Sequence, residues 1–71
     1  MKKGTLVQAP GSDRMIIRYG LEEYGTPLHC GDLLEIKTGG HWRKTRIEYG
    51  EDGWYLVGIK TDSLIGLLAR E

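Results

Sequence analysis

The chain has no phenylalanine, one cysteine, two prolines and no excess of charge of either sign. Ten basic and ten acidic side chains cancel, which removes the general attraction to nucleic acid or to an anionic membrane that a basic protein has. The single cysteine, Cys30, cannot form an intramolecular disulfide, and small secreted domains usually need such bridges. We therefore expect a cytoplasmic protein.

Long apolar runs are also missing. No stretch approaches the roughly 20 apolar residues of a membrane-spanning helix. Met1, Lys2 and Lys3 could open a signal peptide, but residues 4–9 are too few and too polar to form the apolar segment that must follow. The sequence therefore predicts no association with a membrane.

The chain is instead rich in β-type residues, which eleven glycines divide into short segments. Valine, isoleucine, tyrosine, tryptophan and threonine between frequent glycines favour short strands joined by tight turns. The 71 residues make one domain, residues 1–71, and a domain of this size buries only about 60% of the surface that its unfolded chain exposes. A closed sheet is the simplest way to build so small a core.

Six segments carry strand patterns. Residues 20–31 between them have no sustained period and predict an exposed connection that could include one helical turn. The last segment would also suit a short helix capped by Asp62, but Gly66 weakens a helix, and we favour a strand that completes a barrel. The strands are expected over residues 4–9, 14–19, 32–37, 42–49, 54–59 and 64–70.

The glycine pair at positions 39 and 40 lies between two strand patterns. This is typical of a two-residue type I′ hairpin turn, because both central residues of that turn have positive φ. A four-residue loop at 50–53 sets the next hairpin, unless a bulge at Gly50 or Gly53 reverses the faces. The expected facing pairs are Thr38 with His41, Lys37 with Trp42, Glu35 with Lys44, Leu34 with Thr45, Leu33 with Arg46, Ile47 with Leu56, and Glu48 beside Tyr55.

This register assigns each side chain to one face of the sheet. Apolar side chains that alternate with polar ones mark half-buried strands. Trp54, which opens a strand after a glycine turn, is expected to pack against the core. Trp42, by contrast, is expected to point outward as an exposed indole beside Lys44 and Arg46. The expected core residues are Ile17, Leu34, Ile36, Thr45, Ile47 and Leu56.

Two resemblances rest on the middle of the chain. The run Leu28-x-x-Gly31-Asp32-Leu33-Leu34-Glu35-Ile36, followed by Trp42 and the strand to Ile47, resembles the middle of an SH3-like barrel. The Leu28 to Asp32 run, Trp42, the Arg46-Ile47-Glu48 run and the Trp54 to Gly58 run are also similar to a family of short bacterial proteins of unknown function, often associated with mobile elements. The second resemblance implies a small barrel in a bacterial cytoplasm and supplies no catalytic residues.

The chain departs from true SH3 domains at both ends. The tyrosine-rich segment expected near the start is missing, and residues 63–71 have neither the proline nor the tyrosine expected near the end. These residues build the groove that binds polyproline, so we do not expect polyproline recognition. Because SH3-like barrels serve many unrelated roles, the resemblance does not assign a function.

The best candidate for a binding surface lies around Trp42. Small barrels that bind nucleic acid place aromatic rings among cations, so that bases stack on rings while cations meet phosphates. Cations paired with glutamates can equally form a plain solvated face, and Glu35, Glu48 and the acidic loop at 50–53 lie close by. The candidate residues are Trp42, Arg43, Lys44, Arg46 and Tyr55.

Residues His29, Cys30, Asp32 and His41 could in principle form a metal or thiol site. Adjacent residues of an extended segment point opposite ways, and no C-x-x-C or H-x-x-x-H spacing is present, so we expect no metal, no cofactor and no catalytic residue. Cys30 is interpreted as a small apolar side chain near a diverging turn. Asp32 is interpreted as the hydrogen-bond acceptor of that turn.

These patterns predict an all-β protein with a single small SH3-like barrel of five or six strands, built from antiparallel hairpins. We expect a non-enzymatic binding or accessory module that docks on a protein partner through an exposed strand edge or the Trp42 face. The alternative is a nucleic-acid binder that uses Trp42, Arg43, Lys44 and Arg46. The sequence leaves the oligomeric state open.

Overall fold

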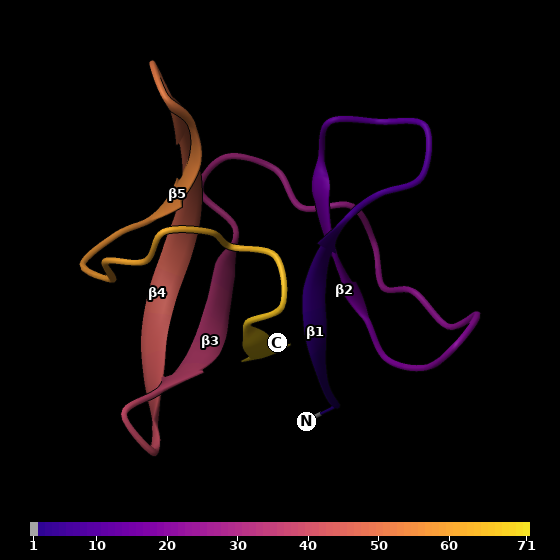
Figure 1. Cartoon of the computed structure of the whole chain (residues 1–71), viewed down its shortest axis with the longest axis horizontal. Helices are drawn as coiled ribbons and strands as arrows, with labels where there is room; N and C mark the ends of the chain where they lie inside the picture. The colour runs from indigo at the N-terminus through magenta and orange to yellow at the C-terminus, as the bar shows by residue number, and fades with distance from the viewer. Residues whose placement is uncertain (1) are drawn as a thin grey trace.

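The structure is a computed structural model that describes residues 2–71. In that range the chain forms six antiparallel strands and no helix, so it has no helix long and apolar enough to span a membrane (Figure 1). The expected all-β fold of a small barrel is confirmed, and residues 20–31 contain no helical turn. The strands are β1 Lys3–Gln8, β2 Met15–Arg18, β3 Leu33–Thr38, β4 His41–Gly50, β5 Gly53–Leu56 and β6 Leu68–Arg70.

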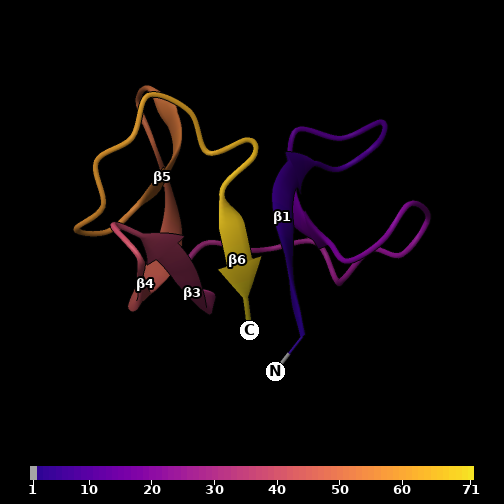
Figure 2. The same cartoon turned by 60° about the horizontal axis from the view of Figure 1, so that its bottom comes forward.

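The strands form one sheet in the order β2-β1-β6-β3-β4-β5. The last strand of the chain therefore lies in the middle of the sheet, where it pairs with β1 on one side and β3 on the other (Figure 2). The expected final strand is confirmed, although it begins at Leu68 and not at residue 64. The sheet curls into a half-barrel, and β6 joins its two halves.

The hairpins of β3, β4 and β5 have the expected register. Gly39 and Gly40 have φ angles of 59° and 82°, as a type I′ turn requires. The facing pairs from Thr38 with His41 to Leu33 with Arg46 are confirmed, and so are Ile47 with Leu56 and Glu48 with Tyr55. No bulge reverses the faces, so the alternation of the sequence places each side chain on the side where it is expected.

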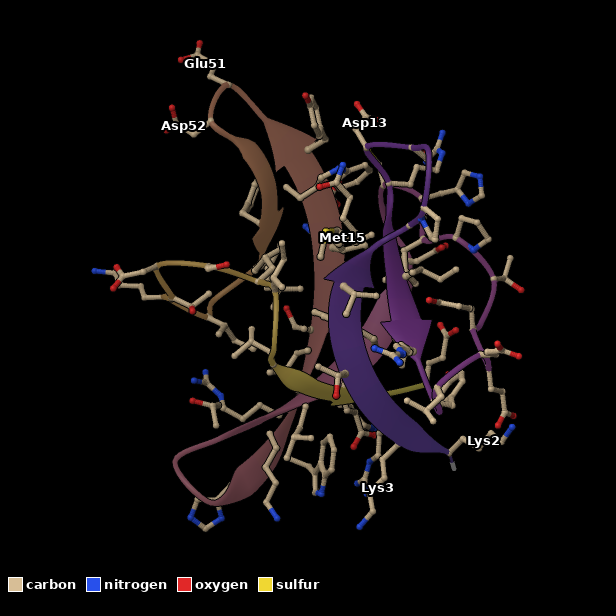
Figure 3. All side chains as sticks on the ribbon, turned by 45° about the vertical axis from the view of Figure 1, so that its right-hand side comes forward. Lys2, Lys3, Asp13, Met15, Glu51 and Asp52 are labelled. Carbon is tan, nitrogen blue, oxygen red and sulfur yellow. The ribbon has the colours of Figure 1, made fainter. Side chains whose placement is uncertain are left out.

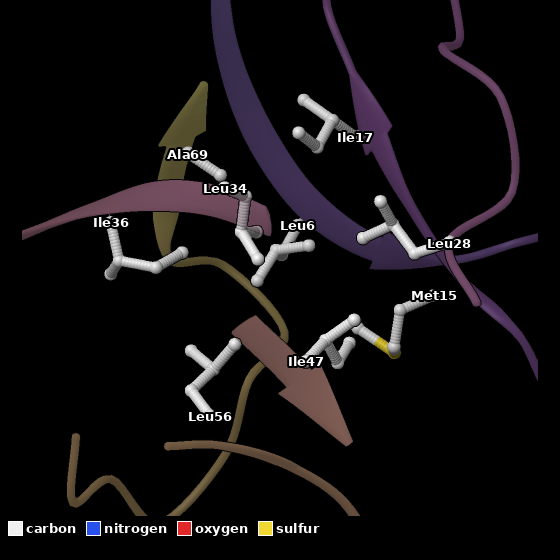
Figure 4. Packing of buried hydrophobic residues seen from close by; sticks show 9 residues of the cluster. All are labelled: Leu6, Met15, Ile17, Leu28, Leu34, Ile36, Ile47, Leu56 and Ala69. Atoms are coloured by element: carbon white, nitrogen blue, oxygen red, sulfur yellow. The ribbon is translucent and has the colours of Figure 1, made fainter. Parts of the chain in front are cut away.

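One cluster of apolar side chains fills the concave side of the sheet (Figure 4). Thr45, expected on this side, is buried, and its hydroxyl donates to the Val57 carbonyl at 2.7 Å. The six expected core residues are all buried. The hydrophobic cluster contains the expected Ile17, Leu34, Ile36, Ile47 and Leu56, together with Leu6, Met15, Leu28 and Ala69.

A hydrogen bond closes the curl of the sheet. The Trp54 indole Nε1 donates to the Asp13 carbonyl at 2.7 Å, which ties β5 to the loop between β1 and β2. The ring of Tyr49 meets the Trp54 ring edge to face, with 4.9 Å between centroids. Trp54 also packs against the core, as the sequence predicts. A single tryptophan thus links the edge strand β5 to the β1–β2 loop at the other side of the curled sheet.

The segment from 20 to 31 covers the free edge of β2. The backbone N–H groups of Gly25 and Leu28 donate to the carbonyls of Ile17 and Met15. The Leu28 side chain is buried in the core, although most of this segment is exposed, as expected. The segment therefore satisfies a strand edge that would otherwise lie open to another chain.

Candidate binding face

The strand register divides the side chains between the core side and the opposite side, which we call the outer face. The pairs Lys3 with Arg70, Arg70 with Glu35, and Glu35 with Lys44 run across four neighbouring strands on this face. Six of its eight charged residues are cationic. The cationic residues are Lys3, Arg18, Lys37, Lys44, Arg46 and Arg70, and the acidic ones are Glu35 and Glu48.

Most acidic side chains lie outside the strands. Of the ten in the chain, only Glu35 and Glu48 are on strands. Figure 3 shows Glu51 and Asp52 at the tip of the β4–β5 hairpin, at the opposite end of the molecule from Lys2 and Lys3. Although the net charge is zero, the positive charges are concentrated on the outer face and most negative charges lie in the loops. A net charge of zero therefore does not exclude an anionic partner for the outer face.

Trp42 lies on the outer face, as expected, but its indole is not freely exposed. The guanidinium carbon of Arg70 lies 4.1 Å from the ring centroid, and the Lys37 ammonium lies 5.9 Å from it. Arg70 donates from Nε and Nη2 to one carboxylate oxygen of Glu35, at 2.9 Å and 2.7 Å. The expectation of a bare exposed indole is wrong, because β6 brings Arg70 over the ring.

The other candidate residues separate into two groups. Lys44, Arg46 and Tyr55 are exposed on the outer face, and Arg46 forms an ion pair with Glu48 at 2.8 Å. Arg43 alternates onto the core side of β4, where its Nη2 lies 3.4 Å from the Gly58 carbonyl. The structure therefore brings together four of the five expected residues and separates Arg43 from them.

Several members of this face were not predicted from the sequence. Lys3 and Arg70 arrive through the pairing of β6 with β1 and β3, which joins residues far apart in the sequence. Leu33 could have been found, because the expected register already put it opposite Arg46. It is 74% exposed, and Leu68 of β6 is 48% exposed. Apolar side chains of this size on a cationic surface are typical of a docking site.

The residues of the diverging turn before β3 stabilise the turn. The His29 N–H donates to the Asp32 carboxylate at 2.8 Å, which confirms Asp32 as the acceptor of this turn. Cys30 is an exposed free thiol and does not pack as an apolar side chain. Among residues 2–71, no three His, Cys, Asp or Glu side chains gather where they could hold a metal ion.

Two ionisable groups near the end of β6 have displaced pKa values. Burial raises the pKa of Glu71, and the negative charge of Asp32 raises it further. Burial also raises the pKa of Tyr19, with a smaller contribution from Glu71. The charged form of each group is therefore disfavoured in the folded protein. Within residues 2–71, Glu71 forms no ion pair with a cation of the outer face.

Comparison with known proteins gives two matches that cover almost the whole chain. The crystal structure of a protein from Ruminococcus gnavus is 40% identical in sequence and has a TM-score of 0.87, and the match covers 97% of this chain and 99% of that one. No curated protein sequence matches this chain significantly. The model of a family described as a domain of unknown function matches residues 4–71. The chain belongs to this family, DUF5348.

Proposed function

We propose that this protein is a non-enzymatic binding module that docks an acidic surface of a partner protein on its outer face. The observation that carries the proposal is the separation of charge, with six cations on the outer face and most carboxylates in the loops. Exposed Leu33, Leu68 and Tyr55 on the same face supply apolar and aromatic contact area. Interfaces typically combine such contacts with a charged rim.

The broad face is a better docking surface than a strand edge. The edge of β2 is covered by backbone hydrogen bonds from Gly25 and Leu28. The opposite edge strand, β5, has only four residues, Gly53–Leu56, and Leu56 already accepts a hydrogen bond from the Ile59 N–H. Few backbone groups are left for pairing with a partner strand.

The cations of the outer face also favour the alternative, a nucleic-acid partner, through contacts to phosphate. Base stacking on Trp42 would require Arg70 to leave the ring and to give up its contact with Glu35. Arg43, which the alternative needs, lies on the other side of β4. The geometry therefore supports a protein partner better.

The setting of this activity is part of the same proposal. The sequence resemblance to proteins associated with mobile elements and the bacterial source of the similar crystal structure support a bacterial origin. The single cysteine, exposed and unpaired, suits a reducing cytoplasm. We propose that the module acts there, as an accessory to another protein.

Site-specific photo-crosslinking in host cells tests the proposal. A photoreactive phenylalanine analogue replaces Tyr55 on the outer face in one variant and Tyr24 in the other. The two tyrosines make a matched pair, because they are 49% and 42% exposed, while Tyr24 lies beyond the edge of β2. We expect a discrete protein adduct from position 55 and none from position 24.

The same experiment separates the two classes of partner. If nuclease treatment removes the adduct formed at position 55, the partner is a nucleic acid, and the protein-partner proposal is wrong. Equal adducts from both positions, or none from position 55, would show that the outer face is not a docking site.

A further inference from the structure

A small hollow lies beside Leu33 on β3. It has a volume of about 210 Å³ and is lined by Leu33, Leu34, Glu35 and Lys44. The pairing of β6 with β3 reaches Glu35 and goes no further towards Leu33, so this end of β3 is paired with β4 on one side and has no paired strand on the other. The missing strand on that side leaves the Leu33 side chain exposed at the hollow, while Leu34 stays buried beneath it.

The size of the hollow limits what it can hold. Sites for cofactors and drug-sized ligands usually have volumes of about 300 to 1,000 Å³. At about 210 Å³ this hollow falls below that range and suits a single side chain of a larger partner. Its leucine walls favour an aliphatic one.

The charges at the rim of the hollow are unbalanced. The Glu35 carboxylate is already engaged by Arg70, at 2.9 Å and 2.7 Å. Lys44 is exposed and forms no ion pair within residues 2–71. The free charge at the rim is therefore positive, which complements a carboxylate next to the bound aliphatic side chain.

We propose that this hollow is the anchor point of the outer face and takes an aliphatic side chain from an acidic segment of a partner protein. A carboxylate within the same segment meets the Lys44 ammonium. This inference rests on the proposed function and adds the chemistry of the partner to it. It also gives Leu33 a role, since an exposed leucine between charged side chains gains the isolated fold little.

Selection from a random dodecapeptide display library tests the pocket while the partner is still unidentified. The bait is the full chain, and an unrelated small β protein sets the background. We expect enriched peptides to carry an aliphatic residue with Asp or Glu within two positions of it. Enrichment should fall about tenfold or more for the bait variants Leu33→Asp and Lys44→Glu, as expected when a central anchor is lost.

Ile65→Asp is the matched control, because Ile65 is also an exposed aliphatic residue, at 58%, and lies outside the hollow. It should retain the enrichment. Lys44→Glu alters the rim charge without shortening a leucine of the hollow, so it tests the pocket even if Leu33→Asp folds poorly. A selection that enriches no acidic aliphatic motif, or one that is insensitive to both substitutions, would overturn the pocket. The Tyr55 adduct remains an independent measure of the proposed function in either case.

Discussion

Trp42 packs its indole under the guanidinium of Arg70, and Glu35 holds that guanidinium in place. A ring in this position stabilises the fold and also forms part of the outer face. Its half-buried state means that losing it removes apolar contact as well as a cation–π interaction, which is worth about 0.5 to 2 kcal/mol.

We expect Trp42→Ala to lower the free energy of unfolding by about 1 to 3 kcal/mol, from the lost ring contact and the lost burial together. Urea denaturation measures this change. Tyr55→Ala, which removes an exposed ring from the same face, is the control and should stay within about 0.5 kcal/mol of the parent. Equal midpoints for the parent and Trp42→Ala would show that Arg70 does not hold the ring in solution.

Gly4 permits the end of β2 to approach β1 closely. A Cβ atom at position 4 would lie 2.2 Å from the carbonyl oxygen of Arg18, so the backbone would have to shift. We expect Gly4→Ala to destabilise the domain by about 1 to 3 kcal/mol. Gly20→Ala is the control in the same thermal melts, because the nearest atom to its Cβ is 3.5 Å away. A Gly4→Ala melt as high as the control would refute this close approach.

The turn between β3 and β4 requires residues that tolerate positive φ, although it has room for a side chain. Gly39 has a φ of 59°, and a Cβ there would meet no atom within 4 Å. A β-branched residue is strained at positive φ, whereas asparagine tolerates it. We therefore expect Gly39→Val to cost about 1 kcal/mol or more and Gly39→Asn to be nearly neutral in thermal denaturation. Similar losses for both variants would mean that the turn has another conformation.

The local hairpins could be predicted because each joins neighbours in sequence. The turn glycines fix the register of β3 with β4, and alternation then places Ile36 and Ile47 in the core and Lys44 outside. The position of β6 between β1 and β3 could not be predicted this way, because the alternation of Leu68–Arg70 does not identify its partner strands. Arg70 over Trp42 was missed for that reason. Leu28 was missed because a lone buried residue in an irregular segment shows no period.

At the scale of the whole molecule, the placement of charge matters more than its sum. Glu71 shows one consequence for stability. Since burial and the Asp32 charge raise its pKa, the folded chain keeps a proton that the unfolded chain releases in the pH interval above the ordinary glutamate value. This group therefore contributes less stability as the pH rises through that interval.

We expect Glu71→Gln to melt at a higher temperature than the parent at neutral pH, with the difference shrinking at about pH 4, near the ordinary pKa of glutamate. Melting curves across this range measure the effect. Glu51→Gln, at the exposed tip of the β4–β5 hairpin, controls for the loss of one charge. A Glu71→Gln advantage that grows as the pH falls would reverse the sign of the argument.

The central claim is that the cationic outer face docks a protein. It is tested most directly by the yield of the position-55 photo-adduct in two double variants of opposite design. Lys37→Glu with Lys44→Glu reverses two exposed charges of the outer face, and Glu51→Lys with Asp52→Lys reverses two exposed charges of the far loop. We predict that the first pair abolishes the protein adduct and that the second leaves it intact. An adduct that survives the first pair, or is lost equally in both, would contradict the claim.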